Sequence, residues 1–327
     1  MPTREQVYNH PLFQAFDPRG KEFLEARRIP FPLNPYEYLG IEIFALVLTK
    51  FPHLKAIPVF QMMLEDFEAG LYEGMHTIVV PSSGNTAHAV GRLAPVFGFR
   101  TTKVVLPSDI PSAKKNLLDA MASVDVLSLG GGKSPAEYAK EEAQKPGHCY
   151  LDQYGHLGNV RAHDLYTGPE IARALAGNIG AIAIPFGSAG TITGVGQFLK
   201  REYHETIVIG VRPLQGESVP GARNEKKMEE VVTFPWQKVT DKVVEVSRHV
   251  SFIKMREMWS VVEPQPGPTS GLAWAGLMHY LARPDTNREQ LGEKKKKVAF
   301  LCMDDGRFYS DPIIAQLNTD QGLSHGS

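Results

Sequence analysis

The chain has 327 residues, enough for one large domain or two ordinary domains with a sizeable core. Its 35 basic and 36 acidic residues nearly balance, which argues against a general binder of nucleic acid, and its longest apolar run, IFALVL, is too short to cross a membrane. Cys149 and Cys302 lack metal-ligand spacing, so we expect no metal site. Two cysteines in so long a chain suggest a reducing compartment and the N-terminus has no apolar core, so we expect a cytoplasmic protein.

Short apolar, β-branched runs alternate with segments of helical length along the chain. Strands are predicted at 77–83, 102–108, 124–130, 181–187, 207–213 and 298–303. Helices are predicted at 57–71, 85–98, 111–123, 134–145, 168–178, 191–203 and 270–282. This alternation predicts an α/β fold of open, wound, mainly parallel sheets, divided into two lobes.

Two strand-to-helix turns, in segments 79–90 and 184–196, are rich in glycine and in small hydroxyl side chains. In wound sheets ligands collect at the carboxyl ends of strands, where such turns lead into helix N-termini. Both turns are therefore candidate binding sites.

The second turn, Gly187-Ser188-Ala189-Gly190-Thr191, does not fit the common nucleotide and nucleophile motifs. Its glycines lack the G-x-G-x-x-G spacing of a dinucleotide site, and no G-x-S-x-G elbow is present. Consecutive N–H groups, two hydroxyls and a helix N-terminus suit a compact phosphate monoester without any lysine or arginine. A purely structural turn is the alternative.

Five segments in unbroken chain order resemble one family. They are PSSGNTAHAV (81–90), QYGHLGNVRAHDLYTGPEI (153–171), GSAGTITGVGQFLK (187–200), GPTSGLAWAGL (267–277) and LCMDDGRFYS (301–310). The first is similar to P-T-S-G-N-T-G, and the third to G-T-G-G-T-I-T-G-V-G-R-Y-L-K, of the pyridoxal-phosphate enzymes of the cysteine synthase and cystathionine β-synthase type. The chain thus resembles a divergent member of that family, with fold type II.

The resemblance implies a tryptophan synthase β-like fold of two open, wound α/β domains. Residues 1–52 and 152–327 would form a larger cofactor-binding domain, and 53–151 a smaller mobile domain with the Ser-Ser-Gly-Asn-Thr loop. It also implies pyridoxal 5′-phosphate as cofactor, a small amino-acid substrate and a homodimer.

Lys55 is the residue that matches the family's catalytic lysine, which forms an imine with the cofactor aldehyde. It precedes the asparagine of the Ser-Gly-Asn string by the family's spacing, and the helix-like segment after it also resembles the family. Lys50 is the nearest rival, and Lys103 lies in a predicted strand.

The other site residues follow from the resemblance by position. Gly187, Ser188, Ala189, Gly190 and Thr191 would bind the cofactor phosphate. Asn85 would contact its 3′-oxygen, and Thr269, or Ser270 after a one-residue slip, would donate to its pyridine nitrogen. The substrate carboxylate would be held by Ser82, Ser83, Gly84, Asn85, Thr86 and Gln153. His88 and His163 are expected to be structural.

The chain departs from the family pattern at two places. Lys55 is followed by Ala56 instead of the Asp-Arg pair that is usual in the family, and Ala189 replaces a glycine. A Cβ at Ala189 is tolerated if that residue keeps a negative φ. The first departure changes the surroundings of the lysine, and therefore bears on the substrate and the reaction outcome.

The function implied is β-replacement on an activated serine, O-acetyl- or O-phosphoserine, through an aminoacrylate, as in cysteine synthase. Two alternatives stay open. One keeps the cofactor but ends in β-elimination, as a lyase or deaminase, or in a diamino acid built with an amine nucleophile. The other is a catalytically inactive regulatory paralogue.

Overall fold

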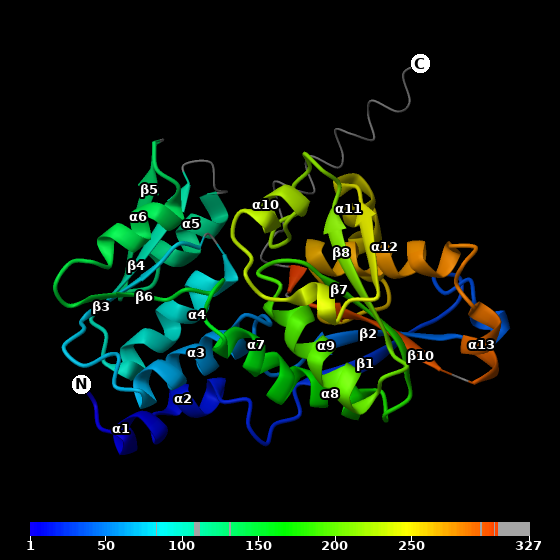
Figure 1. Ribbon diagram of the computed structural model, residues 1–327, viewed down its shortest axis with the longest axis horizontal. Coiled ribbons are helices and arrows are strands. Elements are labelled where there is room, and N and C mark those ends of the chain that lie inside the picture. Colours follow the sequence, from blue (N-terminus) through cyan, green and yellow to red (C-terminus); the bar gives the residue numbers. More distant parts are fainter. Residues whose placement is uncertain (83, 108–111, 131, 295, 304, 307–327) are drawn as a thin grey trace. The chain divides into compact units, whose positions relative to one another are not determined.

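The computed structural model describes residues 1–82, 84–107, 112–130, 132–294, 296–303 and 305–306 (Figure 1). The chain divides into two compact units. The smaller unit comprises Met1–Lys21 and Leu54–Ala162, and the larger unit comprises Glu22–His53 and the described part of His163–Ser327. These bounds differ from the expected ones chiefly at the N-terminus, because residues 1–21 group with the smaller unit.

The smaller unit contains a four-stranded, all-parallel sheet in the order β5-β4-β3-β6. Its strands are β3 (Thr77–Val80), β4 (Thr101–Pro107), β5 (Val124–Leu129) and β6 (His148–Tyr150). Val79 and Val105 pack against Ala139 of α6 on one face of the sheet. Because side chains alternate along a strand, their buried neighbours Ile78 and Val104 point to the opposite face.

The smaller unit also contains helical segments, some of which contact the sheet. They are α1 (Arg4–Tyr8), α2 (Pro11–Phe16), α3 (Ala56–Glu68), α4 (Asn85–Leu93), η2 (Ala94–Phe97), α5 (Ser112–Asp119), α6 (Pro135–Glu142) and α7 (Gly158–Ala162). Helix α3 is buried continuously from Ala56 to Leu64. It contacts α2, α4 and α7.

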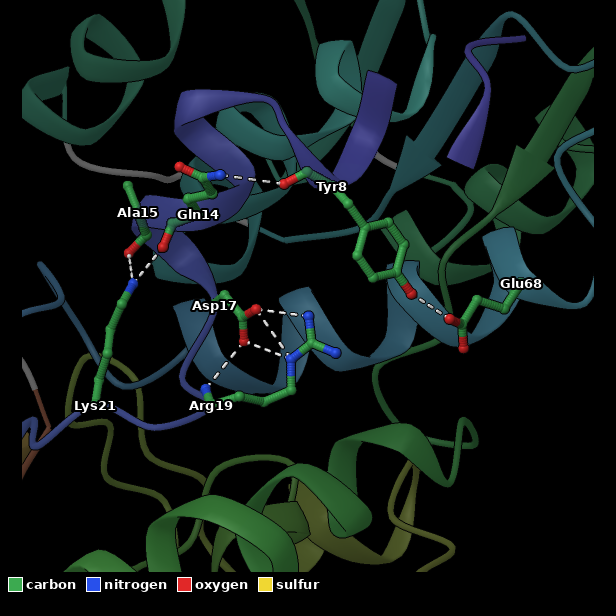
Figure 2. Close-up of polar contacts among 7 residues, drawn as sticks. All are labelled: Tyr8, Gln14, Ala15, Asp17, Arg19, Lys21 and Glu68. Carbon is green, nitrogen blue, oxygen red and sulfur yellow. Dashed lines mark hydrogen bonds and ion pairs between the residues drawn. The ribbon is translucent and has the colours of Figure 1, made fainter. Parts of the chain in front are cut away.

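The N-terminal arm, residues 1–21, belongs to the smaller unit because its side chains contact α3. The ring of Phe13 lies 4.9 Å from that of Phe60 on α3. Figure 2 shows Tyr8 donating to Glu68 at the end of α3, and Arg19 paired with Asp17. The arm is thus attached to α3 by the apolar contact of Phe13 and the hydrogen bond of Tyr8, whereas Arg19 and Asp17 pair within the arm.

The larger unit contains a six-stranded sheet in the order β1-β2-β10-β7-β8-β9. Its strands are β1 (Leu24–Ile29), β2 (Glu42–Leu48), β7 (Ile179–Pro185), β8 (Ile207–Pro213), β9 (Lys242–Val246) and β10 (Lys297–Cys302). Only β1 pairs antiparallel, with β2, and the other pairs are parallel.

Helices cover both faces of this sheet, with α9 on one face and α12 on the other (Figure 1). The elements are η1 (Glu37–Leu39), η3 (His163–Thr167), α8 (Gly168–Ala174), α9 (Gly190–Glu202), α10 (Glu225–Glu229), η4 (Trp236–Lys238), α11 (Arg248–Met258), α12 (Pro268–Ala282) and α13 (Arg288–Glu293). Every residue of β7 is buried. Its Ala181 and Ala183 belong to the core cluster that contains the apolar side chains of α12.

The α/β class with mainly parallel sheets is confirmed. All six predicted strands are present as β3, β4, β5, β7, β8 and β10, whereas β1, β2, β6 and β9 were not predicted. Among the described residues, no helix combines the length and apolar character that a membrane crossing requires.

Candidate active site

The sheet of the larger unit has a topological switch point between β7 and β10. From β7 the chain continues to β8 and β9 on one side, and later returns to β10 on the other side of β7. Ligands in wound sheets bind outside the carboxyl ends of the strands at such a point. The turn after β7 is therefore in the place that the fold favours for binding.

This turn contains the predicted phosphate-binding residues. Ser188 and Thr191 are buried, with 3% and 5% exposure, and Gly190 begins α9. Helix α9 has no side-chain cap, and the first N–H groups of a helix have no partner within the helix. Hydroxyls, N–H groups and the positive end of the helix dipole thus lie together at one position.

The turn contradicts one expectation. Ala189 has φ 60 and ψ −2, so it occupies the left-handed region instead of keeping a negative φ. The reason is its place at the N-cap of α9, where the chain must reverse directly from β7 into the helix. A glycine would adopt this conformation without strain.

The segment at Gly221 packs between the turn after β7 and helix α12. The sequence did not predict this contact. A Cβ placed on Gly187 would lie 3.0 Å from the carbonyl oxygen of Gly221. A Cβ on Gly221, which has φ +88, would lie 3.2 Å from Cγ2 of Thr269. The Val219-Pro220-Gly221 string was the available signal, since Pro-Gly marks a turn, but a turn signal does not reveal its neighbours.

Two buried hydroxyls lie in the first turn of α12, where the partner of the pyridine nitrogen was expected. Thr269 is 4% exposed and Ser270 is 0% exposed. Within the described part of the chain, Ser270 Oγ has no hydrogen-bond partner. A buried hydroxyl with an unmet hydrogen bond is costly, and a ring nitrogen acceptor would satisfy it. Ser270 therefore remains a candidate partner of the pyridine nitrogen alongside Thr269.

The smaller unit has its own switch point, between β3 and β6. The chain passes from β3 to β4 and β5, and then to β6 on the other side of β3. The predicted carboxylate-binding residues follow these two strands. Thr86 on α4 donates its hydroxyl to Gln153 Oε1 at 2.9 Å, and both side chains are buried.

The rest of this loop lies at the same strand end. Gly84 is the N-cap of α4, Asn85 is its first residue, and the Gly84 N–H donates to Ser82 Oγ at 3.4 Å. Ser83 lies outside the described residues. His88, one turn into α4, is half-buried, and burial first, then Arg92, lowers its pKa. This shift of the pKa favours the neutral imidazole of His88.

The three candidate lysines lie in different environments. Lys55 is half-buried at the N-cap of α3, within the smaller unit. Lys103 on β4 forms an ion pair with buried Glu142, with Nζ 2.7 Å from Oε1. Lys50 is exposed and belongs to the larger unit. The ion pair of Lys103 argues against its use as the cofactor lysine.

A cavity of about 270 Å³ opens at the carboxyl ends of β2 and β10, in the larger unit. It is lined by Val47, Leu48, Thr49, Lys50, Phe51, Pro52, Pro264, Cys302 and Asp305. Because β2, β10 and β7 are parallel neighbours, the cavity lies at the same edge of the sheet as the turn after β7. Space for a small ligand and groups that bind an anion thus share that edge.

These features fit pyridoxal phosphate. The turn of residues 187–191 offers N–H groups and hydroxyls to a phosphate, and α12 offers a buried hydroxyl to the acceptor nitrogen of the ring. No group of three or more His, Cys, Asp and Glu side chains that could hold a metal occurs among the described residues.

Two solved structures share the fold of this chain. The structure of O-ureido-L-serine synthase matches with a TM-score of 0.78 at 18% identity, over 96% of this chain and 98% of its own. A hydrogen sulfide-producing enzyme from Fusobacterium nucleatum matches with a TM-score of 0.75 at 20% identity, over 90% and 97%. They confirm the expected fold of two wound α/β domains.

The sequence comparisons give the family. Residues 54–302 match the family described as "Pyridoxal-phosphate dependent enzyme", and the chain belongs to it. Cysteine synthase B of Escherichia coli (strain K12) is 26% identical over 264 residues, 80% of this chain and 84% of that protein. A probable cysteine synthase of Bacillus subtilis (strain 168) is 29% identical over 250 residues, 72% and 78%. The resemblance to the cysteine synthase family and the cofactor are thus confirmed.

Proposed function

We propose that the protein catalyses β-replacement on an activated serine, with O-acetylserine or O-phosphoserine as substrate. One observation of the structure carries the proposal. The first turn of α12 presents buried hydroxyls and no acidic residue. A hydroxyl leaves the pyridine ring neutral, whereas a carboxylate would hold it protonated, and a neutral ring suits departure of a β-substituent better than transamination. The names of the cysteine synthase relatives support the same reaction class.

In this proposal different residues of the chain bind the substrate, bind the cofactor phosphate and remove the α-proton. Thr86 and Gln153, with the loop at Ser82 to Asn85, hold the substrate carboxylate, and the turn of Gly187 to Thr191 holds the phosphate. Pyridoxal phosphate, when bound, would supply the electron sink that α-proton removal requires. Lys55 would hold the cofactor covalently, and its Nζ, once the substrate amine has displaced it, would be free to remove the α-proton as general base. The substituent on the β-carbon would depart with its bonding electrons, a nucleophile would bond to the same carbon, and Lys55 Nζ would return the proton to the α-carbon.

Borohydride reduction of the holoenzyme, followed by peptide mass mapping, tests the lysine. We expect the cofactor to be fixed on the peptide with Lys55 and turnover to fall by at least about 100-fold in Lys55→Ala. Lys50→Ala tests the rival lysine and should leave the cofactor fixed on Lys55, whereas Lys133→Ala, at an exposed surface pair with Glu141, is the control and should keep both properties. Cofactor fixed on another lysine, or a Lys55→Ala variant with full activity, would refute the assignment.

The residues around Lys55 favour a second candidate, β-elimination to a keto acid and ammonia. Ala56 follows the lysine where the family has a charged pair, so the surroundings of the lysine differ from those in the family. Product analysis with O-acetylserine and O-phosphoserine, with and without sulfide, distinguishes the two. A condensed amino acid that forms only with the nucleophile supports replacement, and pyruvate under both conditions supports elimination.

We also infer a homodimer from the family resemblance. Light scattering on the purified holoenzyme would give twice the chain mass of 36.1 kDa if this is right, and the chain mass itself if it is wrong.

A further inference from the structure

A buried chain of two hydroxyls and one imidazole ends at the proposed phosphate turn. His163 Nδ1 lies 2.9 Å from Thr167 Oγ1, and its Nε2 lies 3.1 Å from Thr191 Oγ1. His163 and Thr167 are 0% exposed and Thr191 is 5% exposed, so water does not compete for these contacts. All three residues belong to the larger unit.

The local backbone determines the position of these three hydrogen-bonded side chains. Residues His163–Thr167 form the single π-helical turn η3, which leads into α8 and contacts α9. Single π turns inside helices occur frequently at functional sites. At the end of η3, a Cβ on Gly168 would lie 2.6 Å from Cγ of Phe198 on α9, so the glycine permits the close approach of the two segments.

The direction of each hydrogen bond decides what Thr191 can do. A hydroxyl has one proton and can donate only once. If Thr191 donates to His163 Nε2, its proton is used and cannot reach a phosphate. If Nε2 carries a proton and donates to Thr191 Oγ1, the proton of Thr191 stays available to a phosphate oxygen.

Thr167 can select the second arrangement. Its hydroxyl makes no capping bond at the start of α8. By donating to His163 Nδ1, it leaves the imidazole proton on Nε2, because a neutral imidazole has one donor and one acceptor nitrogen. The order of donors is then Thr167, His163, Thr191 and the phosphate.

We propose that His163 and Thr167 are positioning residues that turn the hydroxyl proton of Thr191 toward the cofactor phosphate. This inference depends on the proposed phosphate site at Gly187 to Thr191. Neither His163 nor Thr167 needs to touch the cofactor. A merely structural histidine would only support the packing of η3 on α9. Its loss would then weaken the binding of pyridoxal phosphate and of pyridoxal to the same extent.

Equilibrium dialysis of the full-length apoenzyme against pyridoxal 5′-phosphate and against pyridoxal, which lacks the phosphate, separates these roles. Thr191→Val reports the phosphate site itself. His163→Asn keeps a polar group at the position of Nδ1 but none at Nε2, whereas His163→Gln keeps an N–H donor near Nε2. Thr167→Val keeps the side-chain shape and removes only the hydroxyl, which guards against misfolding of a buried histidine variant.

We expect Thr191→Val to weaken pyridoxal phosphate binding by about 10- to 100-fold, the effect of losing a hydrogen bond to a charged group. His163→Asn and Thr167→Val should weaken it by about 5- to 10-fold, and His163→Gln by less than about 3-fold. Pyridoxal binding should stay within about 2-fold in all four variants. His163→Asn combined with Thr191→Val should bind as Thr191→Val alone, since both act on one hydrogen bond.

Two results would overturn the inference, and they differ in what they leave standing. If Thr191→Val weakens binding of the phosphorylated ligand alone while His163→Asn and Thr167→Val do not, the phosphate site stands and the positioning role falls. If Thr191→Val affects both ligands alike or neither, the proposed phosphate site fails and the inference fails with it.

Discussion

Ala189 occupies a backbone conformation that a residue with a Cβ adopts at a cost of about 1 kcal/mol or more. Because glycine adopts it freely, we predict that Ala189→Gly raises the free energy of unfolding of the apoenzyme. The gain should be about 0.5–1 kcal/mol, since the greater freedom of glycine in the unfolded chain offsets part of the relief. Urea denaturation measures it.

Ala176 provides the matched control. It has φ 54 and is exposed, whereas Ala189 is 2% exposed. Ala176→Gly should therefore give a gain of similar size without any loss of packing. If Ala189→Gly loses stability while Ala176→Gly gains, the methyl group of Ala189 contributes more by its contacts than its backbone strain costs.

At the scale of single residues, the sequence predicts identities better than conformations and neighbours. The hydroxyls of Ser188, Thr191 and Thr269 could be named from their motifs, and the structure finds each of them buried next to a helix start. The positive φ of Ala189 could not be predicted, because alanine usually avoids it and only the geometry of the turn from β7 into α9 requires it. The approach of Gly221 to Thr269 could not be predicted either, because the two residues are far apart in the chain.

Among the structural elements, the N-terminal arm depends most on one side chain. Phe13 is 1% exposed and lies against Phe60 of α3 and Phe97 of η2. We predict that Phe13→Ala lowers the free energy of unfolding by about 3–5 kcal/mol, as loss of a buried aromatic ring does. Phe31 is 72% exposed, so Phe31→Ala should change it by less than about 0.5 kcal/mol. Equal losses in both variants would show that Phe13 does not anchor the arm.

Helix α6 is tied to the sheet of the smaller unit by a buried carboxylate. Hydrogen bonds from Lys103 on β4 and from Lys145 lower the pKa of Glu142 to about 2. The folded protein therefore favours the ionised form, and Glu142 contributes stability that is present above its ordinary pKa of 4.5. That contribution is lost as the pH falls from about 5 toward 2.

We predict that Glu142→Gln lowers the free energy of unfolding at pH 7 by about 1–2 kcal/mol, a value limited by the partial exposure of both lysines. The difference from the wild type should shrink as the pH falls toward 3, which urea titrations at several pH values would show. Glu141 precedes it on α6 and pairs with Lys133 at the exposed surface. Glu141→Gln should therefore change stability little at any pH.

Three of the four strands that the sequence missed, β1, β6 and β9, lack a long apolar run, whereas β2 contains the run IFALVL and could have been predicted. β1 and β9 lie at the two edges of the larger sheet, and exposed residues interrupt both of them, so neither contains a long apolar run. β6 has only three residues. The central strands β3 and β7 are buried throughout and gave the clear apolar runs that sequence patterns detect. The edge strand β5 was predicted from its apolar residues although it is half-exposed.

At the scale of the whole molecule, each unit has its own sheet and its own buried carboxylate. Glu142 belongs to the smaller unit, and Glu170 on α8 belongs to the larger one. The three tryptophans, Trp236, Trp259 and Trp274, all lie in the larger unit. Tryptophan fluorescence therefore reports unfolding of the larger unit directly, whereas far-ultraviolet circular dichroism reports both units.

Glu170 allows the acid sensitivity of the larger unit to be tested with this probe. Its carboxylate is 8% exposed and accepts hydrogen bonds from the N–H groups of Phe23, at 2.8 Å, and Leu24, at 3.2 Å. Burial alone would raise its pKa, but the hydrogen bonds from Arg173 and from these two N–H groups outweigh it and lower the pKa below its ordinary value. Glu170 thus contributes stability at neutral pH that is lost in acid.

We predict that Glu170→Gln lowers the free energy of unfolding at pH 7 by about 1–2 kcal/mol, because a neutral amide accepts these hydrogen bonds more weakly than a carboxylate does. Urea unfolding followed by tryptophan fluorescence should show a lower midpoint for the variant at pH 7. The two midpoints should converge as the pH falls toward 3, where the wild-type carboxyl takes up its proton. A difference that stays constant from pH 7 to pH 3 would mean that Glu170 acts through its packing and shape, and that its charge adds nothing to the attachment of α8 to β1.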